Sequence, residues 1–413
     1  MSQTSPPAAG PVALAERIAS LDVLRGFALL GILVVNIQVF AMIDIALFNP
    51  TAYGDFSGAN LLVWLLTHVL FDQKFMTIFS MLFGAGIVLM AQRAEAAGSR
   101  PAGRHYRRML WLALVGVLHA HLLWFGDILY SYGICGLWAY LFRKVRPSRL
   151  LVVGLLLIAL ASSLNILFGW SMQFWPEEQI QTFATDWAPD AAAVDAELTT
   201  YRSGWLGQME HRHPTALEME TLVFLVWALW RAGGLMLVGM ALFKLGFFSA
   251  ERSTAAYART AAVAFPIGLA LVIYGVLRHF DAGWSVEYSF FLGTQFNYWG
   301  SLGVSLGLVS LVMLWCRASI MASLKRSLSA VGQMALTNYL MHTIICTTIF
   351  YGHGLGLFGR VERVGQLGIV VAIWILQLVI SPIWLRRFRF GPFEWVWRSL
   401  TYLKLQPMRR ASG

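Results

Sequence analysis

Hydrophobic residues in this chain are gathered into long runs that are separated by short polar segments. Ten of these runs approach the length of about 20 residues that an α-helix needs to cross a bilayer. The pattern therefore predicts an all-α polytopic membrane protein with about ten transmembrane helices. The predicted spans are residues 20–43, 73–92, 109–124, 128–142, 149–171, 220–243, 256–278, 296–316, 331–350 and 366–385.

The apolar stretch 59–92 is too long for one straight span. Its 34 residues would extend about 50 Å at about 1.5 Å per residue, whereas the hydrocarbon core is about 30 Å thick. We therefore expect residues 59–71 to form an interfacial or re-entrant segment that leads into a span beginning near Lys74. Lys74 would then lie at the outer end of its span, where its ammonium group can snorkel to the interface or contact a substrate.

Basic residues distinguish the two sides of this arrangement. Most Lys and Arg residues fall in the segments that lie on the same side as the N-terminus. Because cytoplasmic loops carry an excess of Lys and Arg, both termini are expected in the cytoplasm. The chain then divides into an N-terminal five-span half (1–171), an acidic extracytoplasmic loop (172–219) and a C-terminal five-span half (220–413).

The composition agrees with a membrane protein and argues against a nucleic-acid partner. Hydrophobic residues make up 58% of the chain and charged residues 13%, against roughly a quarter charged in soluble proteins. The net charge of +10 comes from short clusters between apolar runs, not from a basic domain. The partner that this composition indicates is the lipid bilayer.

The first span, "SLDVLRGFALLGILVVN", places polar side chains on one helix face. The intervals between Asp22, Arg25 and Asn36 are sums of steps of three and four residues, and such steps align side chains on one face of a helix. Asp22 and Arg25 can pair near the cytoplasmic edge, either as an interface anchor or as part of a substrate site. Asn36 lies about 20 Å further along, where an amide can serve a site or bond a neighbouring helix.

The third and fourth spans form a hairpin, "WLALVGVLHAHLLWFGDILYSYGICG". His119 and His121 are about 200° apart on a helix, so they cannot serve one site together. The His119 face carries the small residue Gly116, which predicts that His119 points into the bundle as a candidate general base or as a structural hydrogen-bonding group. Asp127 is separated from His119 by about 12 Å of helical rise, which predicts no direct pair and a role in the turn or in substrate binding.

The ninth span, "VGQMALTNYLMHTIICTTIF", carries a polar stripe of Asn338, His342 and Cys346 at intervals of four residues. His342 and His119 lie about 16 Å and about 15 Å from the cytoplasmic ends of their spans. We expect these two histidines and Asn36 to meet in a polar cavity near mid-membrane. No metal site is predicted, because isolated histidines without carboxylate or thiolate partners are not a ligand signature.

Two other segments carry polar residues of interest. Arg231 in "RAGGLMLVGMALFKLG" lies within a span, which is costly unless the side chain is paired or faces water, so it is a candidate ligand contact. The segment "GPFEWVWRSLTY" predicts a cytoplasmic interfacial helix. In that helix Pro392 would occupy the first turn, and Glu394 would pair with Arg398.

Together these segments resemble the YeiB family of bacterial inner-membrane proteins, whose C-terminal half is a domain of unknown function. The resemblance implies a location in the bacterial inner membrane, and it extends over nearly the whole chain. The first span also resembles that of membrane acyltransferases, including the heparan-glucosaminide N-acetyltransferase group. Relatives of that type often have a histidine close behind the RG motif, whereas here Asn36 follows and no histidine occurs before His68.

Two functions remain open after this reading. The first is acyl transfer from a cytoplasmic acyl-CoA, with phosphates near the basic segment 100–108, to a small-molecule or lipid-linked acceptor. The second is secondary transport through an inverted repeat of five plus five spans. The predicted catalytic residues are His119, Asn36 and His342. The predicted substrate contacts are Asn338, Arg25, Asp22, Asp127, Lys74 and Arg231.

Overall fold

The computed structural model describes residues 18–410, and the regular structure in that part of the chain is helical. Residues 1–17 and 411–413 lie outside the described residues, and they include the two chain termini that the sequence predicts in the cytoplasm. The elements are α1 (Ala19–Ala41), η2 (Asp44–Leu47), α2 (Gly58–Leu70), α3 (Lys74–Ala96), α4 (Ala102–Leu122), α5 (Leu129–Ala139), η3 (Tyr140–Lys144), α6 (Pro147–Ser171), η4 (Met172–Phe174), α7 (Glu177–Trp187), α8 (Ala191–Arg202), α9 (Met209–Glu218), η5 (Met219–Ala228), α10 (Leu229–Lys244), α11 (Thr254–Asp281), η6 (Glu287–Leu292), α12 (Thr294–Arg317), α13 (Ala322–Gln333), α14 (Ala335–Phe350), α15 (Arg363–Arg387) and α16 (Pro392–Tyr402).

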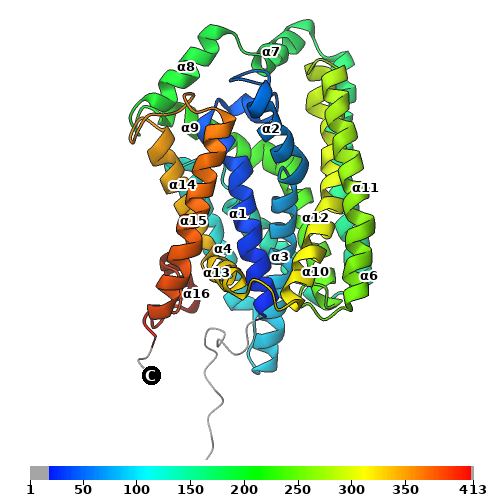
Figure 1. Cartoon of the computed structure of the whole chain (residues 1–413), viewed down its shortest axis with the longest axis vertical. Coiled ribbons are helices and arrows are strands. Elements are labelled where there is room, and N and C mark those ends of the chain that lie inside the picture. Colours follow the sequence, from blue (N-terminus) through cyan, green and yellow to red (C-terminus); the bar gives the residue numbers. More distant parts are fainter. Residues whose placement is uncertain (1–17, 411–413) are drawn as a thin grey trace, which may run out of the picture.

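The long helices form an upright bundle with α1 near its centre (Figure 1). In the most apolar part of α1, 78% of the residues are buried, whereas the corresponding share is 22% in both α11 and α15. The start of α1 and α16 lie at one end of the bundle, and α7, α8 and α9 lie at the other, which we call the loop end. A helix that is apolar on all sides and surrounded by exposed apolar helices is typical of a membrane-embedded bundle.

The ten predicted spans all coincide with helical segments. Seven helical segments of the described chain are long and apolar enough to cross a membrane. The other three predicted spans fall on α4, which begins with three arginines, and on α5 and α14, which have 11 and 16 residues. The membrane character of the protein is therefore supported, while the count of ten stays a prediction.

Helices α2 and α3 follow one another end to end, with a break at residues 71–73 (Figure 1). Gln73 has a φ of 62° in the left-handed region, which interrupts the helical hydrogen bonds. The prediction that Lys74 snorkels to the interface is wrong, because its side chain is fully buried at this break. The predicted segment 59–71 coincides with α2 (Gly58–Leu70), which packs against α1, α11 and α15 within the bundle.

Glycines allow α3 and α10 to pack backbone against backbone. A methyl group at Gly84 would collide with the carbonyl group of Met236, and one at Gly239 would collide with that of Met81. Such small residues let membrane helices approach closely. The close crossing brings Arg231 of α10 next to α3 and α12.

The C-terminal helix α16 fixes the start of α14. Pro392 occupies its first turn, as the sequence predicts. Glu394, which the sequence assigns to a surface pair, is buried, and its Oε1 accepts hydrogen bonds from the backbone N–H groups of Leu336 (2.6 Å) and Thr337 (3.0 Å). A carboxylate at a helix N-terminus satisfies unpaired N–H groups and favours the helix dipole. This cap holds α14 in place against α4.

Candidate functional site

A chain of three buried side chains connects α4, the turn after it and α14. His119 Nδ1 lies 2.8 Å from Asp127 Oδ1, and His119 Nε2 lies 2.9 Å from Thr343 Oγ1. The side chains of His119 and Asp127 are 1% and 2% exposed. The prediction that Asp127 is too far away for a direct pair is therefore wrong. It treated the chain as a continuing helix, whereas the chain turns back after α4.

The turn is built so that Asp127 faces His119. Asp127 Oδ2 accepts a hydrogen bond from the backbone N–H of Tyr130 (2.7 Å), in the first turn of α5. A side chain at Gly116 would collide with that same N–H group and with the Asp127 carboxylate. The small face around Gly116 thus permits α4 and α5 to close on the histidine, and the inward direction predicted for His119 is confirmed by its burial.

Aromatic rings surround the imidazole of His119. The ring centroid of Tyr339 lies 5.5 Å from that of His119, and Trp124 lies 6.4 Å away with its ring nearly perpendicular. Trp124 also stacks on Phe40 of α1, with centroids 4.0 Å apart. The indole Nε1 of Trp124 is buried and has no hydrogen-bond partner among the described residues. Helices α1, α4 and α14 therefore enclose the histidine.

His121 points away from this centre. Its Nδ1 lies 2.6 Å from Nδ1 of His213, and its Nε2 lies 3.2 Å from a carboxylate oxygen of Glu220. His119 and His121 thus have separate sets of partners, as their angular spacing predicts.

The predicted polar stripe of α14 contacts α15. His342 Nε2 lies 2.9 Å from Oε1 of Gln377, whose amide donates to the carbonyl of Asn338 (3.0 Å). The Asn338 amide donates to Ser381 Oγ (3.1 Å). The residue of α14 that reaches His119 is Thr343, next to His342. Sequence reasoning missed Thr343 because a threonine in an apolar helix carries no signal that distinguishes it from its neighbours.

The remaining first-span residues lie apart from this centre. Asn36 is partly exposed, and within the described residues its side chain makes no hydrogen bond. The structure therefore does not bring Asn36, His119 and His342 into direct contact, and their common role stays a prediction. Arg25 donates a hydrogen bond of 2.8 Å to Asp22, so the expected pair at the start of α1 is present.

A second polar centre lies at the break between α2 and α3. The ammonium group of Lys74 donates to the backbone carbonyl of His68 (2.6 Å) and to the side-chain oxygen of Asn297. Asn297 in turn donates to Asp72 (2.7 Å), which lies 3.3 Å from His68 Nδ1. Sequence reasoning missed His68 and Asp72, although their spacing of four residues beside Lys74 was a usable signal.

Arg231 lies beside this centre and is fully buried. Its guanidinium group donates to Ser301 Oγ (2.8 Å) and to the carbonyl of Tyr298 (3.3 Å), and it lies 3.9 Å from the centroid of the Tyr298 ring. Its Nε has no partner among the described residues. The direct hydrogen-bond partners of Arg231 are thus neutral groups.

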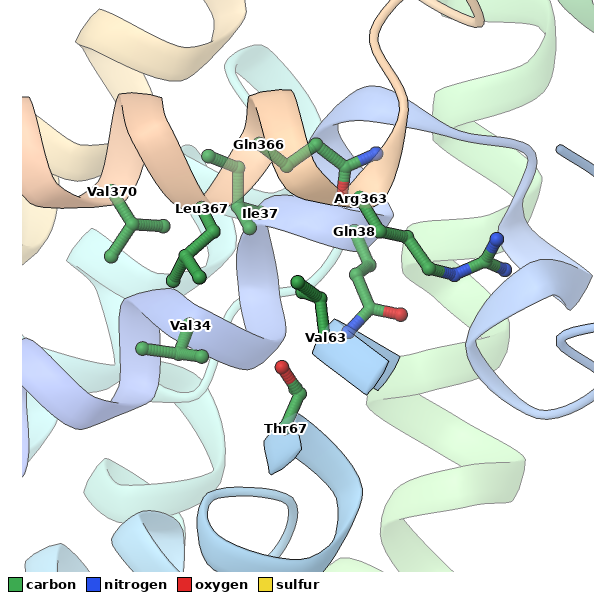
Figure 2. Close-up of a pocket in the computed structure, with 9 residues that line it drawn as sticks. All are labelled: Val34, Ile37, Gln38, Val63, Thr67, Arg363, Gln366, Leu367 and Val370. Carbon is green, nitrogen blue, oxygen red and sulfur yellow. The ribbon is translucent and has the colours of Figure 1, made fainter. Parts of the chain in front are cut away.

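Two pockets open beside α1. The first lies between α1, α2 and α15 (Figure 2). Its polar lining consists of Gln38, Thr67, Arg363 and Gln366, and its lining does not include Asn36, His119 or His342. The second pocket is lined in part by Gln38, His68 and Asp72, so it adjoins the second polar centre. Neither pocket was predicted from the sequence.

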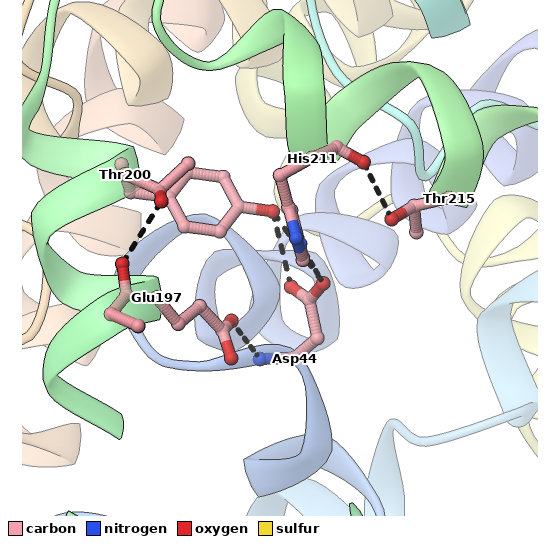
Figure 3. Close-up of polar contacts among 7 residues, drawn as sticks. Asp44, Glu197, Thr200, His211 and Thr215 are labelled. Atoms are coloured by element: carbon pink, nitrogen blue, oxygen red, sulfur yellow. Dashed lines mark hydrogen bonds and ion pairs between the residues drawn. The ribbon is translucent and has the colours of Figure 1, made fainter. Parts of the chain in front are cut away.

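Residues from three segments meet at the loop end. Figure 3 shows Asp44 beside Glu197 and His211. His211 Nε2 lies 3.1 Å from Asp44 Oδ2, and Glu197 accepts a hydrogen bond of 2.8 Å from the Asp44 backbone. Their potential ligand atoms all lie within 4.8 Å of one another, and one nitrogen with two oxygens suits Zn²⁺ or Mn²⁺. In this structure Glu197 and His211 each bond Asp44, which fastens α8 and α9 to η2, the short helix after α1.

Comparison with known proteins places these features in a family. Residues 242–404 match the model of a protein of unknown function, DUF418. The chain is 33% identical to the uncharacterized protein YeiB of Escherichia coli (strain K12), over 94% of this chain and 96% of YeiB. It is 34% identical to the uncharacterized protein YxaH of Bacillus subtilis (strain 168), over 97% of this chain and 98% of YxaH. An uncharacterized 39.9 kDa protein from the amylase 3′ region of Bacillus acidopullulyticus is 27% identical over 96% of this chain and 97% of its own length.

Proposed function

Since this chain belongs to the YeiB-like family, whose members YeiB and YxaH resemble it from end to end, we propose that it is a multi-pass acyltransferase of the bacterial inner membrane. It transfers an acyl group from a cytoplasmic acyl-CoA to a hydroxyl or amine of a small-molecule or lipid-linked acceptor. The observation that supports this proposal is the buried chain of Asp127, His119 and Thr343.

The roles within this chain follow from its hydrogen bonds. The Asp127 carboxylate accepts the proton on His119 Nδ1, so Nε2 carries the lone pair that can remove a proton from a hydroxyl or amine. Asp127 orients the imidazole and stabilises the imidazolium that forms. Burial excludes water, which strengthens these interactions and protects an acyl intermediate from hydrolysis.

Basic residues at the start of α4 offer a place for the donor. Arg107 donates to the carbonyl of Thr401 (3.0 Å), and the guanidinium of Arg108 lies 4.2 Å from the ring centroid of Trp397. The segment is thereby held against α16 at the end of the bundle opposite the loop end. Fixed guanidinium groups suit the phosphates of coenzyme A.

A matched pair of histidine variants tests the proposal. Membranes from cells that express the full-length protein are incubated with acetyl-CoA, and the release of free CoA is measured. General-base catalysis typically contributes 10²–10⁴ in rate, about 3–5 kcal/mol of barrier lowering. His119→Ala should therefore reduce CoA release by at least about 100-fold. His121→Ala, on the same helix, should leave the rate within a few-fold.

Secondary transport is the second candidate function, because one observation favours it. The interrupted α2–α3 segment carries the buried Lys74, with Asp72 and Arg231 nearby, and discontinuous helices often form the sites of transporters. Equal activity of the His119→Ala and His121→Ala variants would contradict the acyltransferase proposal and favour transport.

A further inference from the structure

Thr343 uses its hydroxyl group differently from neighbouring threonines of α14. Thr348 donates to the carbonyl of Ile344, four residues earlier (2.6 Å), which is the usual bond of a threonine within a helix. The hydroxyl of Thr343 instead lies 2.9 Å from His119 Nε2, and the residue is 1% exposed. The bond therefore serves the contact between α4 and α14.

The direction of this hydrogen bond follows from the rest of the chain. Asp127 is fixed by the Tyr130 N–H and accepts the proton on His119 Nδ1. A neutral imidazole then has only a lone pair on Nε2, so the Thr343 hydroxyl must be the donor. A hydroxyl that donates to a histidine oriented by a carboxylate is an activated nucleophile.

A hydrogen-bond donor without a partner lies next to the same histidine. Trp124 is 2% exposed, and its indole N–H has no acceptor within residues 18–410. A buried polar group usually has a partner, so this donor calls for an explanation. The oxyanion that forms when a nucleophile attacks a thioester carbonyl is an acceptor that suits this indole N–H.

We propose that Thr343 carries the acyl group covalently between donor and acceptor, an inference that rests on the acyltransferase function proposed above. Thr343 Oγ1 attacks the thioester carbonyl, a C–O ester bond forms and the C–S bond breaks. The hydroxyl proton passes to His119 Nε2 and then to the departing sulfur, which leaves as free CoA thiol. In the second half-reaction the acceptor attacks the ester, and its proton returns through His119 to Thr343 Oγ1.

The test needs no knowledge of the acceptor. A covalent carrier catalyses exchange between acetyl-CoA and labelled CoA in the absence of acceptor. Purified full-length protein in detergent should show this exchange, and mass spectrometry should find one acetyl group on the peptide that contains Thr343. Thr343→Val should reduce the exchange at least about 100-fold, whereas Thr343→Ser, which retains a hydroxyl, should stay within about tenfold of the wild type.

Thr347→Val is the matched control. Thr347 is buried on the same helix, and its hydroxyl donates only to the backbone carbonyl of Ile344 in that helix. It should leave the exchange unchanged, and monodisperse elution of both valine variants shows that they fold. Exchange that persists in Thr343→Val overturns the inference. The inference is also overturned if membranes release CoA in a His119-dependent way but the purified protein shows no exchange. In that case the acyltransferase function stands, with direct transfer from donor to acceptor. Absence of acetyl-CoA consumption in both assays overturns the function and the inference together.

Discussion

At the loop end, the carboxyl group of Glu197 lies close to that of Asp44. His211 and Tyr201 also face the carboxyl group of Asp44. Burial, and then the negative charge of Asp44, raise the pKa of Glu197 from 4.5 to about 7. The folded protein therefore keeps a proton on Glu197 at pH values where the unfolded chain has released it. The resulting stabilisation is fully present below the unfolded pKa and is lost as the pH rises through about 7.

We expect Glu197→Gln to weaken the pH dependence of stability. The amide cannot ionise, so the thermal unfolding temperature of the variant in detergent should fall less than that of the wild type between about pH 5 and about pH 8. Asp195→Asn is the control, because Asp195 is exposed on the same helix. Parallel pH profiles for wild type and Glu197→Gln would contradict this account of the cluster.

Single residues also show where sequence reasoning stops. The inward direction of His119 could be predicted, because Gly116 lies on the same helix and helical geometry fixes which residues share a face. Its partners could not be predicted. Asp127 reaches His119 through a reversal of the chain, and Thr343 is 224 residues away. Local spacing carries no information about either contact.

At the scale of helices, the crossing of α3 and α10 brings Arg231 next to α3 and depends on glycine. Gly84→Val should destabilise the protein by about 1–3 kcal/mol, since the added side chain would meet the backbone of Met236 and force the helices apart. A lower unfolding temperature and a lower yield of monodisperse protein would be measured.

Gly86→Val provides the control for this crossing. Gly86 lies on the same helix, half a turn away, and a side chain added there would have no atom of another residue within 4 Å. Both substitutions remove a glycine from α3 and add the same β-branched side chain. Similar unfolding temperatures for the two variants would show that the close crossing does not limit stability.

The positions of the helices and the break before Lys74 followed from the hydrophobic pattern, but the break at Met334 did not. The polar residues Asp72, Gln73 and Lys74 mark the first break, and the sequence predicts a span that begins there. The second break, at Met334, lies inside the predicted span 331–350, where the structure ends α13 and starts α14. Tertiary contacts produce these breaks: Lys74 is held by Asn297 of α12, and α14 starts where Glu394 of α16 caps it. A pattern of hydrophobicity records burial and does not record such partners.

At the scale of the whole molecule, the bundle separates a basic end from an acidic end. The basic start of α4 and the helix α16 lie at one end, and the acidic segment 172–219 covers the other (Figure 1). His119 lies near the end of α4 that is remote from its arginines. An acyl group taken from a cytoplasmic donor would therefore travel along the bundle toward the loop end, which agrees with an acceptor at or across the membrane.

The orientation of this bundle in the membrane gives the last prediction. The start of α1 and α16 lie at the same end, and α8 lies at the opposite end (Figure 1). Because Lys and Arg are concentrated in the segments at the first of these ends, that end should face the cytoplasm. A reporter that is active only in the cytoplasm should work when fused at the C-terminus and fail when fused after residue 200. A periplasmic reporter should give the reverse pattern, and an insertion between α12 and α13 should behave like the C-terminal fusion. Cytoplasmic activity after residue 200 would invert the orientation, and it would place the proposed acyl-CoA donor on the wrong side for the arginines of α4.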